Sequence, residues 1–211
     1  MLTAAPVKIG DVRRAVLAGL LLLAATACRV EPPGEENYIQ RITSARAEKD
    51  ATFQRQSEPV PDNRKIEFLP LAYYPVDPSF NVPAVLKPPT DTQPLKMAYS
   101  DGAIRDVRRL GTLEFTLKGQ PFKLTAYQEV ASPDVNHVFV PFSDLTSATD
   151  TYPAGRYIDL RRTPTGYYEL DFNVAYNPSC YFSPLFSCPV PPKENRLPVQ
   201  VFAGEKIKVK S

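Results

Sequence analysis

Proline is unusually frequent in this chain, where it makes up 23 of 211 residues. That is about twice its average share in proteins. Proline has no backbone N–H and ends or kinks a helix interior. From residue 65 onward, short apolar runs alternate with Pro, Gly, Asp and Ser, a pattern typical of strands joined by stiff turns. The sequence therefore predicts a mainly β fold rather than a helix bundle.

The predicted strands are short and follow one another at turn signals. They lie at 65–74, 82–86, 94–99, 103–109, 112–118, 121–130, 137–142, 156–162, 167–174 and 198–209. The sequence KGQP at 118–121 separates two of them and predicts a hairpin turn. Such spacing favours an antiparallel barrel or sandwich of about nine to ten short strands.

One helix is predicted ahead of the strands, at 35–57. Its apolar residues Ile39, Ile42 and Phe53 share a thin stripe, so we expect the helix to lie on the surface of the sheet. No internal repeat or boundary divides the remainder of the chain. We therefore predict that residues 58–211 form a single β domain.

The N-terminal residues 1–27 have the organisation of an export signal. Three basic residues precede the apolar run AVLAGLLLLAATA, which is shorter than the roughly 20 residues that a membrane-spanning helix needs. Small residues then precede Cys28, which resembles a bacterial lipobox. We predict a signal peptide at 1–27, a lipid on Cys28 that anchors the protein in the cell envelope, and a tether at 28–34. Ordinary cleavage, giving a soluble secreted or periplasmic protein, is the alternative.

The charge balance argues against a nucleic-acid partner. The chain has 25 Lys and Arg against 23 Asp and Glu, and residues 1–27 hold three of the basic residues and one acidic residue. The mature chain is therefore formally neutral, whereas nucleic-acid binding needs a basic face.

Sequence motifs of the common enzyme classes are absent. His137 is the single histidine, which excludes HExxH, and the chain has no GxSxG, SxxK, GxxxxGK[ST] or GxGxxG. His137 falls in a predicted strand, where we interpret it as structural. The acidic loop 143–155 lacks the spacing of an EF-hand. No metal and no cofactor is predicted.

Polar residues gather on two successive predicted strands, 156–162 and 167–174. Alternate positions carry Tyr, Asp, Arg, Glu or Asn, and the positions between them are mainly apolar. Successive strands commonly pair, which would join these positions into one surface. That surface is either a solvated outer face or a polar cup in which Arg holds an anionic or hydroxylated ligand. Its residues are Tyr157, Asp159, Arg161, Tyr167, Glu169, Asp171 and Asn173.

Two cysteines lie close together in the next segment. Cys180 and Cys188 are separated by seven residues, a spacing that fits neither a zinc knuckle nor a CxxC redox motif. An exported protein meets an oxidising environment, so we predict a disulfide that contributes about 2–3 kcal/mol. Other polar residues of this segment could project into the cup: Tyr176, Asn177, Glu194 and Asn195.

Several stretches resemble the bacterial domain-of-unknown-function family 1684. They are VFVPFSDLTSATDTYPAGRYIDL at 138–160, LDFNVAYNPSCYFSPLFSCPVPPKENRL at 170–197 and AGEK at 203–206. The resemblance implies a predominantly β domain but no established activity. Ala148, Pro153 and Ala154 stand where the family usually has glycine, so the loop is stiffer here. The resemblance implies this polar cluster: Asp144, Thr146, Tyr152, Arg156, Asp159, Asp171, Asn173, Tyr176, Asn177, Cys180, Cys188, Glu194 and Asn195.

Three functions fit these features. The first is an envelope-anchored β domain that binds a small polar ligand through the polar cluster. The second is a hydrolase that uses paired carboxylates, either Asp159 with Asp171 or Asp171 with Glu194. The third is a docking lipoprotein whose contact is an exposed apolar patch. That patch would consist of Tyr181, Phe182, Leu185 and Phe186.

Overall fold

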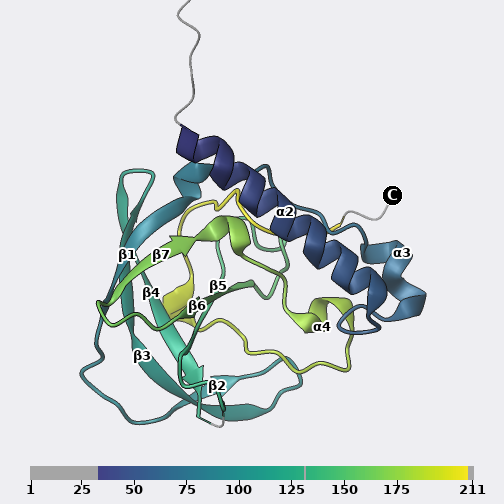
Figure 1. Ribbon diagram of the computed structural model, residues 1–211. Coiled ribbons are helices and arrows are strands. Elements are labelled where there is room, and N and C mark those ends of the chain that lie inside the picture. The colour runs from purple at the N-terminus through teal and green to yellow at the C-terminus, as the bar shows by residue number, and fades with distance from the viewer. Residues whose placement is uncertain (1–32, 131, 209–211) are drawn as a thin grey trace, which may run out of the picture. The chain divides into compact units, whose positions relative to one another are not determined.

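Seven strands make one antiparallel sheet in the computed structural model, which describes residues 33–130 and 132–208 (Figure 1). The strands are β1 (Asn81–Lys87), β2 (Leu95–Ala98), β3 (Ile104–Leu117), β4 (Gln120–Glu129), β5 (His137–Phe142), β6 (Arg156–Arg161) and β7 (Tyr167–Asp171). Their order is β6-β5-β4-β3-β1-β7, and β2 also pairs with β3. The mainly β antiparallel fold is confirmed, with fewer strands than expected.

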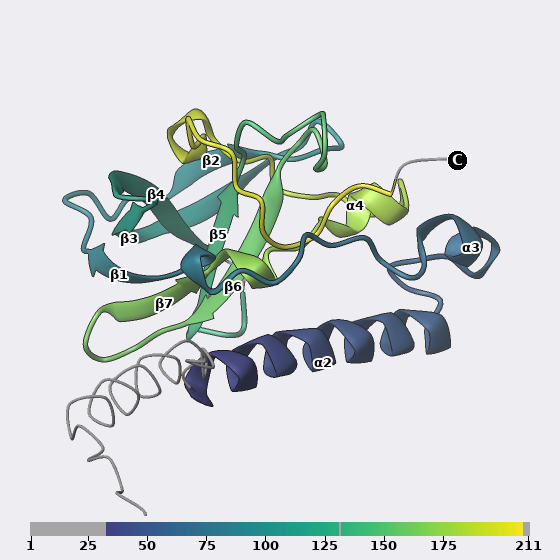
Figure 2. The ribbon, with the colours of Figure 1, turned by 90° about the horizontal axis from the view of Figure 1, so that it is seen from above.

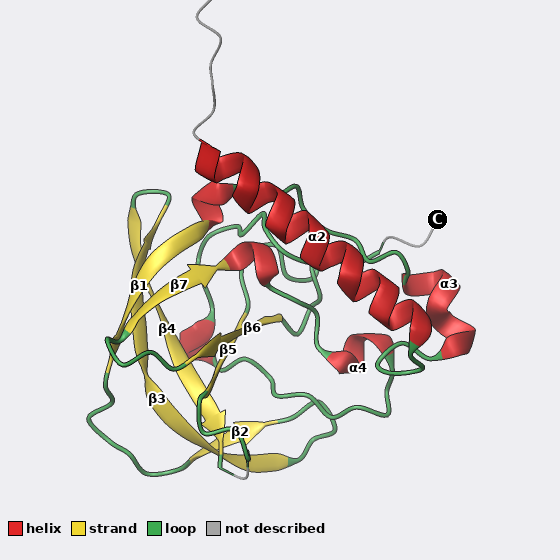
Figure 3. Cartoon of the chain, viewed as in Figure 1, coloured by secondary structure: helices red, strands yellow, loops and turns green. Residues whose placement is uncertain are grey.

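The sheet curls into a nearly closed barrel around an apolar core (Figure 3). β6 and β7 are the two ends of the strand order, so the predicted pairing of these successive strands is wrong. A single bridge between Tyr157 and Tyr176 instead links β6 to the chain that follows β7. The fully buried core side chains include Leu113, Leu117, Leu124, Val138, Val140, Phe142, Ile158, Leu170 and Phe172.

Two predicted strands, 103–109 and 112–118, form one continuous strand, β3. A register shift between Arg109 and Gly111 marks a β-bulge opposite β4. Gly111 has a φ of 153°, and a Cβ there would lie 2.4 Å from the carbonyl oxygen of Lys87, so only glycine fits. The predicted hairpin turn is confirmed, with positive φ at both Lys118 and Gly119.

Two other predicted strands are wrong. Residues 65–74 instead begin with the short helix α3 (Lys65–Phe68), and the rest of this stretch forms no strand. The described residues of 198–209 form no ladder. Their backbone bonds go to different partners, such as Tyr74 N–H to Gly204 O at 3.0 Å.

The helices lie outside the sheet. They are α2 (Pro33–Arg55), α3, α4 (Ser179–Phe182) and the 3-10 turns η1 (Asp62–Arg64), η2 (Pro78–Phe80), η3 (Phe172–Val174) and η4 (Lys193–Asn195). None of the helices in the described part of the chain has the length and hydropathy that crossing a membrane requires. The predicted signal peptide, the lipidation residue Cys28 and the tether up to residue 32 lie outside the described residues.

The long helix α2 corresponds to the helix predicted at 35–57. The described residues from Asn37 onward form one compact unit, which includes most of α2 (Figure 2). Few apolar side chains hold the helix, and Ile42 is its only fully buried one among the described residues. Polar contacts also hold the helix: the Tyr38 hydroxyl donates to Asp171 at 2.8 Å, and Arg46 donates to the Tyr74 carbonyl at 2.8 Å.

Residues 176–196, which we call the covering segment, contribute side chains such as Tyr176, Phe186 and Cys188 to the outer face of β4, β5 and β6. Beneath it a second apolar cluster forms from Met97, Tyr99, Val107, Tyr127, Phe139, Tyr157 and Cys188. The inward residues of the same strands, such as Val138 and Ile158, belong to the barrel core. These strands are therefore covered on both faces, and the candidate site lies on the outer one.

Candidate functional site

A pocket of about 310 Å³ lies between the covering segment and the outer face of β4, β5 and β6. We call it the outer pocket. Its lining combines carboxylates, hydroxyls and aromatic rings. The lining residues are Glu129, Ser132, His137, Phe139, Tyr157, Asp159, Tyr176, Ser179, Phe186, Ser187, Cys188 and Pro189.

A chain of three polar side chains occupies one wall of the outer pocket. His137 Nε2 lies 2.7 Å from Asp159 Oδ1, and the Tyr176 hydroxyl donates to Asp159 Oδ2 at 2.6 Å. The pairing of β5 with β6 sets His137 opposite Arg161, which makes Asp159 its diagonal neighbour. Burial, followed by the neighbouring carboxylate, raises the pKa of Tyr176, so this phenol stays a proton donor.

The opposite wall carries the second carboxylate of the pocket, Glu129, at the end of β4. It accepts a hydrogen bond of 2.6 Å from the Tyr99 hydroxyl. Burial first, and then Glu129, raises the pKa of Tyr99, so this hydroxyl keeps its proton. Lys and Arg are absent from the described residues that line the pocket. Glu129 and Asp159 therefore favour a ligand that is positively charged.

Aromatic rings form the apolar part of the lining. The rings of Phe139 and Tyr157 pack edge-to-face with centroids 4.8 Å apart, and those of Tyr157 and Tyr176 with centroids 5.7 Å apart. Phe186 adds a further ring from the covering segment. The pocket therefore has both a rigid apolar wall and acidic groups.

Cys180 and Cys188 are adjacent in space but not bonded. Both are free cysteines, so the predicted disulfide is not found in the structure. The Cys180 N–H donates to Cys188 Sγ at 3.0 Å, and the Cys188 N–H donates to Ser100 Oγ at 3.0 Å. Cys188 also lines the outer pocket. The fold therefore places a pair of thiols beside the candidate site.

Of the residues predicted from sequence for the polar cup or the polar cluster, the structure places Tyr157, Asp159, Tyr176 and Cys188 in the lining of the outer pocket. Arg156, a residue of the cluster that the resemblance implied, is buried elsewhere and pairs with Asp144 at 2.7 Å, whereas Arg161, the arginine of the predicted cup, is exposed and pairs with Asp134 at 3.2 Å. Thr146 is also buried, where its N–H donates to Asp144 at 2.6 Å and its hydroxyl bonds with Thr151. These residues shape the loop that precedes β6.

Other residues of the predicted cluster hold α2 and the C-terminal part of the chain in place. Asp171 and Asn173 are buried under α2, where the Asn173 amide donates to the Asp77 carbonyl at 2.8 Å. The Asn177 N–H donates to Glu205 Oε2 at 2.8 Å. Each of these groups is used by the fold, so the predicted cup does not form as one surface.

The remaining predicted residues lie around the covering segment. Glu194 accepts from the Tyr127 hydroxyl at 2.8 Å, and the ring of Tyr152 packs on that of Tyr181 with centroids 5.3 Å apart. Asn195 is fully buried between β4 and β5. Asp171 lies under α2, and it pairs with neither Asp159 nor Glu194 as the hydrolase hypothesis required.

The apolar patch expected for docking is divided. Phe182 is buried against Phe53 and Phe68, and Phe186 lines the outer pocket. Leu185 is 90% exposed, and it is the only one of the four patch residues that faces solvent to this extent. The structure therefore offers no continuous patch from these residues.

Sequence reasoning missed His137 and Glu129 as site residues. His137 was interpreted as structural, but its side chain is 36% exposed and faces Asp159. The signal that could have found it is the β5–β6 pairing, which places a histidine and an aspartate on the same outer face. Within the described residues, no group of three or more His, Cys, Asp or Glu is arranged to hold a metal ion.

The fold and the pocket together define a small antiparallel barrel with a ligand-sized site on its outer face. The family model described as "Protein of unknown function (DUF1684)" matches residues 66–206, which is more than half of the chain. The chain therefore belongs to this family, as its sequence resemblance indicated.

A solved structure is similar to this chain over most of the length of both proteins. It is the solution NMR structure of an uncharacterized protein from Haloarcula marismortui, 33% identical, with a TM-score of 0.64. The match covers 82% of this chain and 96% of that protein. No curated protein matches the chain.

Proposed function

We propose that this domain is a binding module that holds a small polar ligand in the outer pocket. The observation that carries the proposal is the composition of the lining, which has two carboxylates and several aromatic rings but neither Lys nor Arg among its described residues. Its volume of about 310 Å³ suits a ligand of a few heavy atoms to about the size of a sugar.

The lining chemistry favours a ligand that is an organic cation. Glu129 and Asp159 attract positive charge, and aromatic rings stabilise ammonium groups through their π faces. Ser132, Ser179 and Ser187 supply hydroxyls for further polar groups of the ligand. An amine that also carries hydroxyls, such as an amino sugar or amino alcohol, satisfies each of these features.

Titration calorimetry with choline, putrescine and glucosamine as probes tests this proposal, with glucose as the neutral match of glucosamine. We expect at least one cation to bind, and Glu129→Gln and Asp159→Asn each to weaken that binding by about tenfold through loss of a charge-assisted contact. Glu114→Gln is the control, since Glu114 pairs with Lys123 outside the pocket. Absence of binding by all four probes would contradict the proposal, and equal binding of glucose and glucosamine would contradict the preference for a cation.

Acid–base catalysis is the second candidate, and the contact between His137 and Asp159 favours it. A histidine oriented by a carboxylate can accept or donate a proton at neutral pH. In that case the bound probe would be converted, and mass spectrometry of the calorimetry samples would detect a product. His137→Ala would then abolish conversion while leaving binding of the probe.

We further propose that the domain is exported and anchored to a membrane of the cell envelope through a lipid on Cys28. The basic residues, the apolar run and the small residues before Cys28 support this. Intact mass spectrometry of protein purified from its own cells should show a chain that begins at Cys28 and carries a diacylglyceryl group. A cleaved chain without a lipid would indicate the soluble secreted or periplasmic form, and an uncleaved chain would exclude export.

A further inference from the structure

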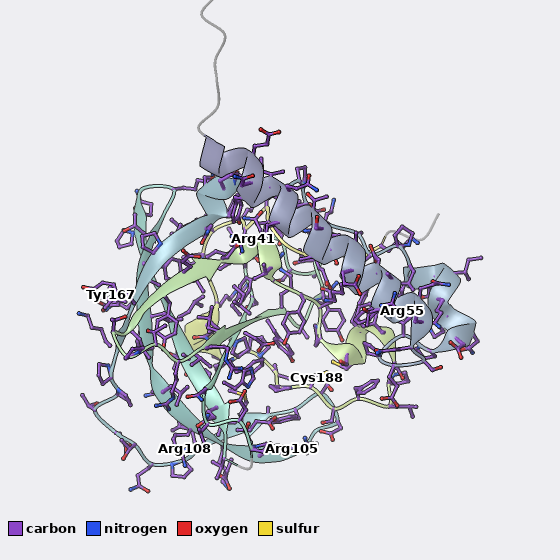
Figure 4. All side chains as sticks on the ribbon, viewed as in Figure 1. Arg41, Arg55, Arg105, Arg108, Tyr167 and Cys188 are labelled. Atoms are coloured by element: carbon purple, nitrogen blue, oxygen red, sulfur yellow. The ribbon has the colours of Figure 1, made fainter. Side chains whose placement is uncertain are left out.

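The pair formed by Cys180 and Cys188 has the geometry of a reactive dithiol. Cys180 lies in α4 and is partly exposed. Cys188, which is labelled in Figure 4, is buried and belongs to the lining of the outer pocket. The Cys188 sulfur accepts the Cys180 N–H at 3.0 Å, and Ser100 fixes the Cys188 backbone. The fold thus holds together two thiols whose sequence spacing is not that of a redox motif.

The surroundings of the two thiols differ, and this gives them different roles. Cys180 is hydrogen-bonded by the Cys188 thiol, which has the largest effect, and also by the hydroxyls of Ser100 and Tyr152. These bonds outweigh the effect of burial and lower the pKa of Cys180 to about 6. The same hydrogen bond to Cys180, followed by burial, raises the pKa of Cys188. Cys180 is therefore the more acidic thiol of the pair and the better nucleophile, whereas Cys188 holds its proton more strongly.

We propose that Cys180 and Cys188 form a thiol–disulfide exchange site for small disulfides, with Cys180 as the attacking residue and Cys188 as the resolving one. The inference rests on the partly exposed position of Cys180 and on the adjacent Cys188 sulfur. It does not require the outer pocket to bind a cation, so either proposal can fail without the other.

The exchange has two steps. The Cys180 thiolate attacks one sulfur of the small disulfide, and the other half leaves as a thiolate that takes up a proton from solvent. The Cys188 thiol then loses its proton to solvent and attacks Cys180 Sγ, which expels the second half as a thiol. One small disulfide is reduced to two thiols, and the two cysteines are oxidised to one disulfide, which an excess of small thiol converts back.

Intact mass spectrometry after incubation with glutathione disulfide tests the proposal on the full chain carrying Cys28→Ser. We expect the mass to fall by two hydrogens with no glutathione retained. With Cys188→Ser added, the mixed disulfide on Cys180 should accumulate. With Cys180→Ser instead, the remaining Cys188 should react at least tenfold more slowly. Equal reaction of the two serine variants, or reaction only after denaturation in urea, would overturn the proposal.

A second measurement keeps the test valid if a serine variant fails to fold. Limited labelling of the Cys28→Ser chain with iodoacetamide, followed by peptide mapping, should modify Cys180 well before Cys188. Tyr152→Phe removes a hydroxyl donor from Cys180 and should slow this labelling several-fold, whereas Tyr167→Phe, at a residue that is 65% exposed, should leave it unchanged. Labelling of Cys188 first would contradict the assigned roles.

Discussion

Replacing Arg156 with alanine is expected to lower the free energy of unfolding by about 3–5 kcal/mol, because it leaves Asp144 as an unpaired buried carboxylate. The side chains of Arg156 and Asp144 are only 1% and 0% exposed. Arg156 also donates to the carbonyls of Val201 and Glu205 at 3.1 and 3.2 Å. The substitution therefore frees both the loop before β6 and the C-terminal part of the chain.

Urea unfolding followed by circular dichroism measures this effect, and the same strand supplies a matched control. Arg161 on β6 pairs with Asp134 at 3.2 Å, but its side chain is 73% exposed. Arg161→Ala should therefore cost less than about 1 kcal/mol. Similar losses in the two variants would show that the buried pair contributes no more than a surface pair does.

Replacing Asn195 with alanine should lower the free energy of unfolding by about 3 kcal/mol, since it leaves three buried backbone groups without a partner. Asn195 Oδ1 accepts the Thr125 N–H at 2.7 Å, and its amide donates to the carbonyls of Thr125 and Pro141 at 2.8 and 2.6 Å. Because β4 and β5 share only one register pair, this side chain acts as a connector between the two strands.

The same unfolding experiment checks Asn195→Ala, and Asn136→Ala serves as its control. Asn136 is exposed in the loop before β5, so its loss should change stability by less than about 0.5 kcal/mol. A small effect for Asn195→Ala would mean that water satisfies the freed backbone groups, and the structural role assigned to Asn195 would be wrong.

Local patterns in the sequence predicted most of the strands. Short apolar runs between turn residues placed β1, β4, β5, β6 and β7 close to their observed bounds, and the hairpin turn followed from KGQP at 118–121. The pairing of β6 with β7 was predicted wrongly because strand order depends on how the sheet closes. That closure joins residues far apart in the chain, such as Asn81 and Asp171 in the pairing of β1 with β7, and no short stretch records it.

The candidate site was harder to predict than the fold. Arg156, Asn195 and Asp159 are all polar residues in similar stretches, yet the first two are buried structural groups and only Asp159 reaches the pocket. Burial decides between these roles, and it depends on contacts between distant residues, such as those of Arg156 with the carbonyls of Val201 and Glu205. The position of His137 beside Asp159 was not predicted either, because it follows from the pairing of β5 with β6.

The outer pocket is built on the outside of the barrel, whereas the interior is filled by its own packed core. Substitutions among the pocket residues therefore leave the interior packing untouched. For the ligand site that we propose, a change of specificity would require substitutions only in the covering segment and in a few outward residues. The scaffold can stay constant while its specificity diverges.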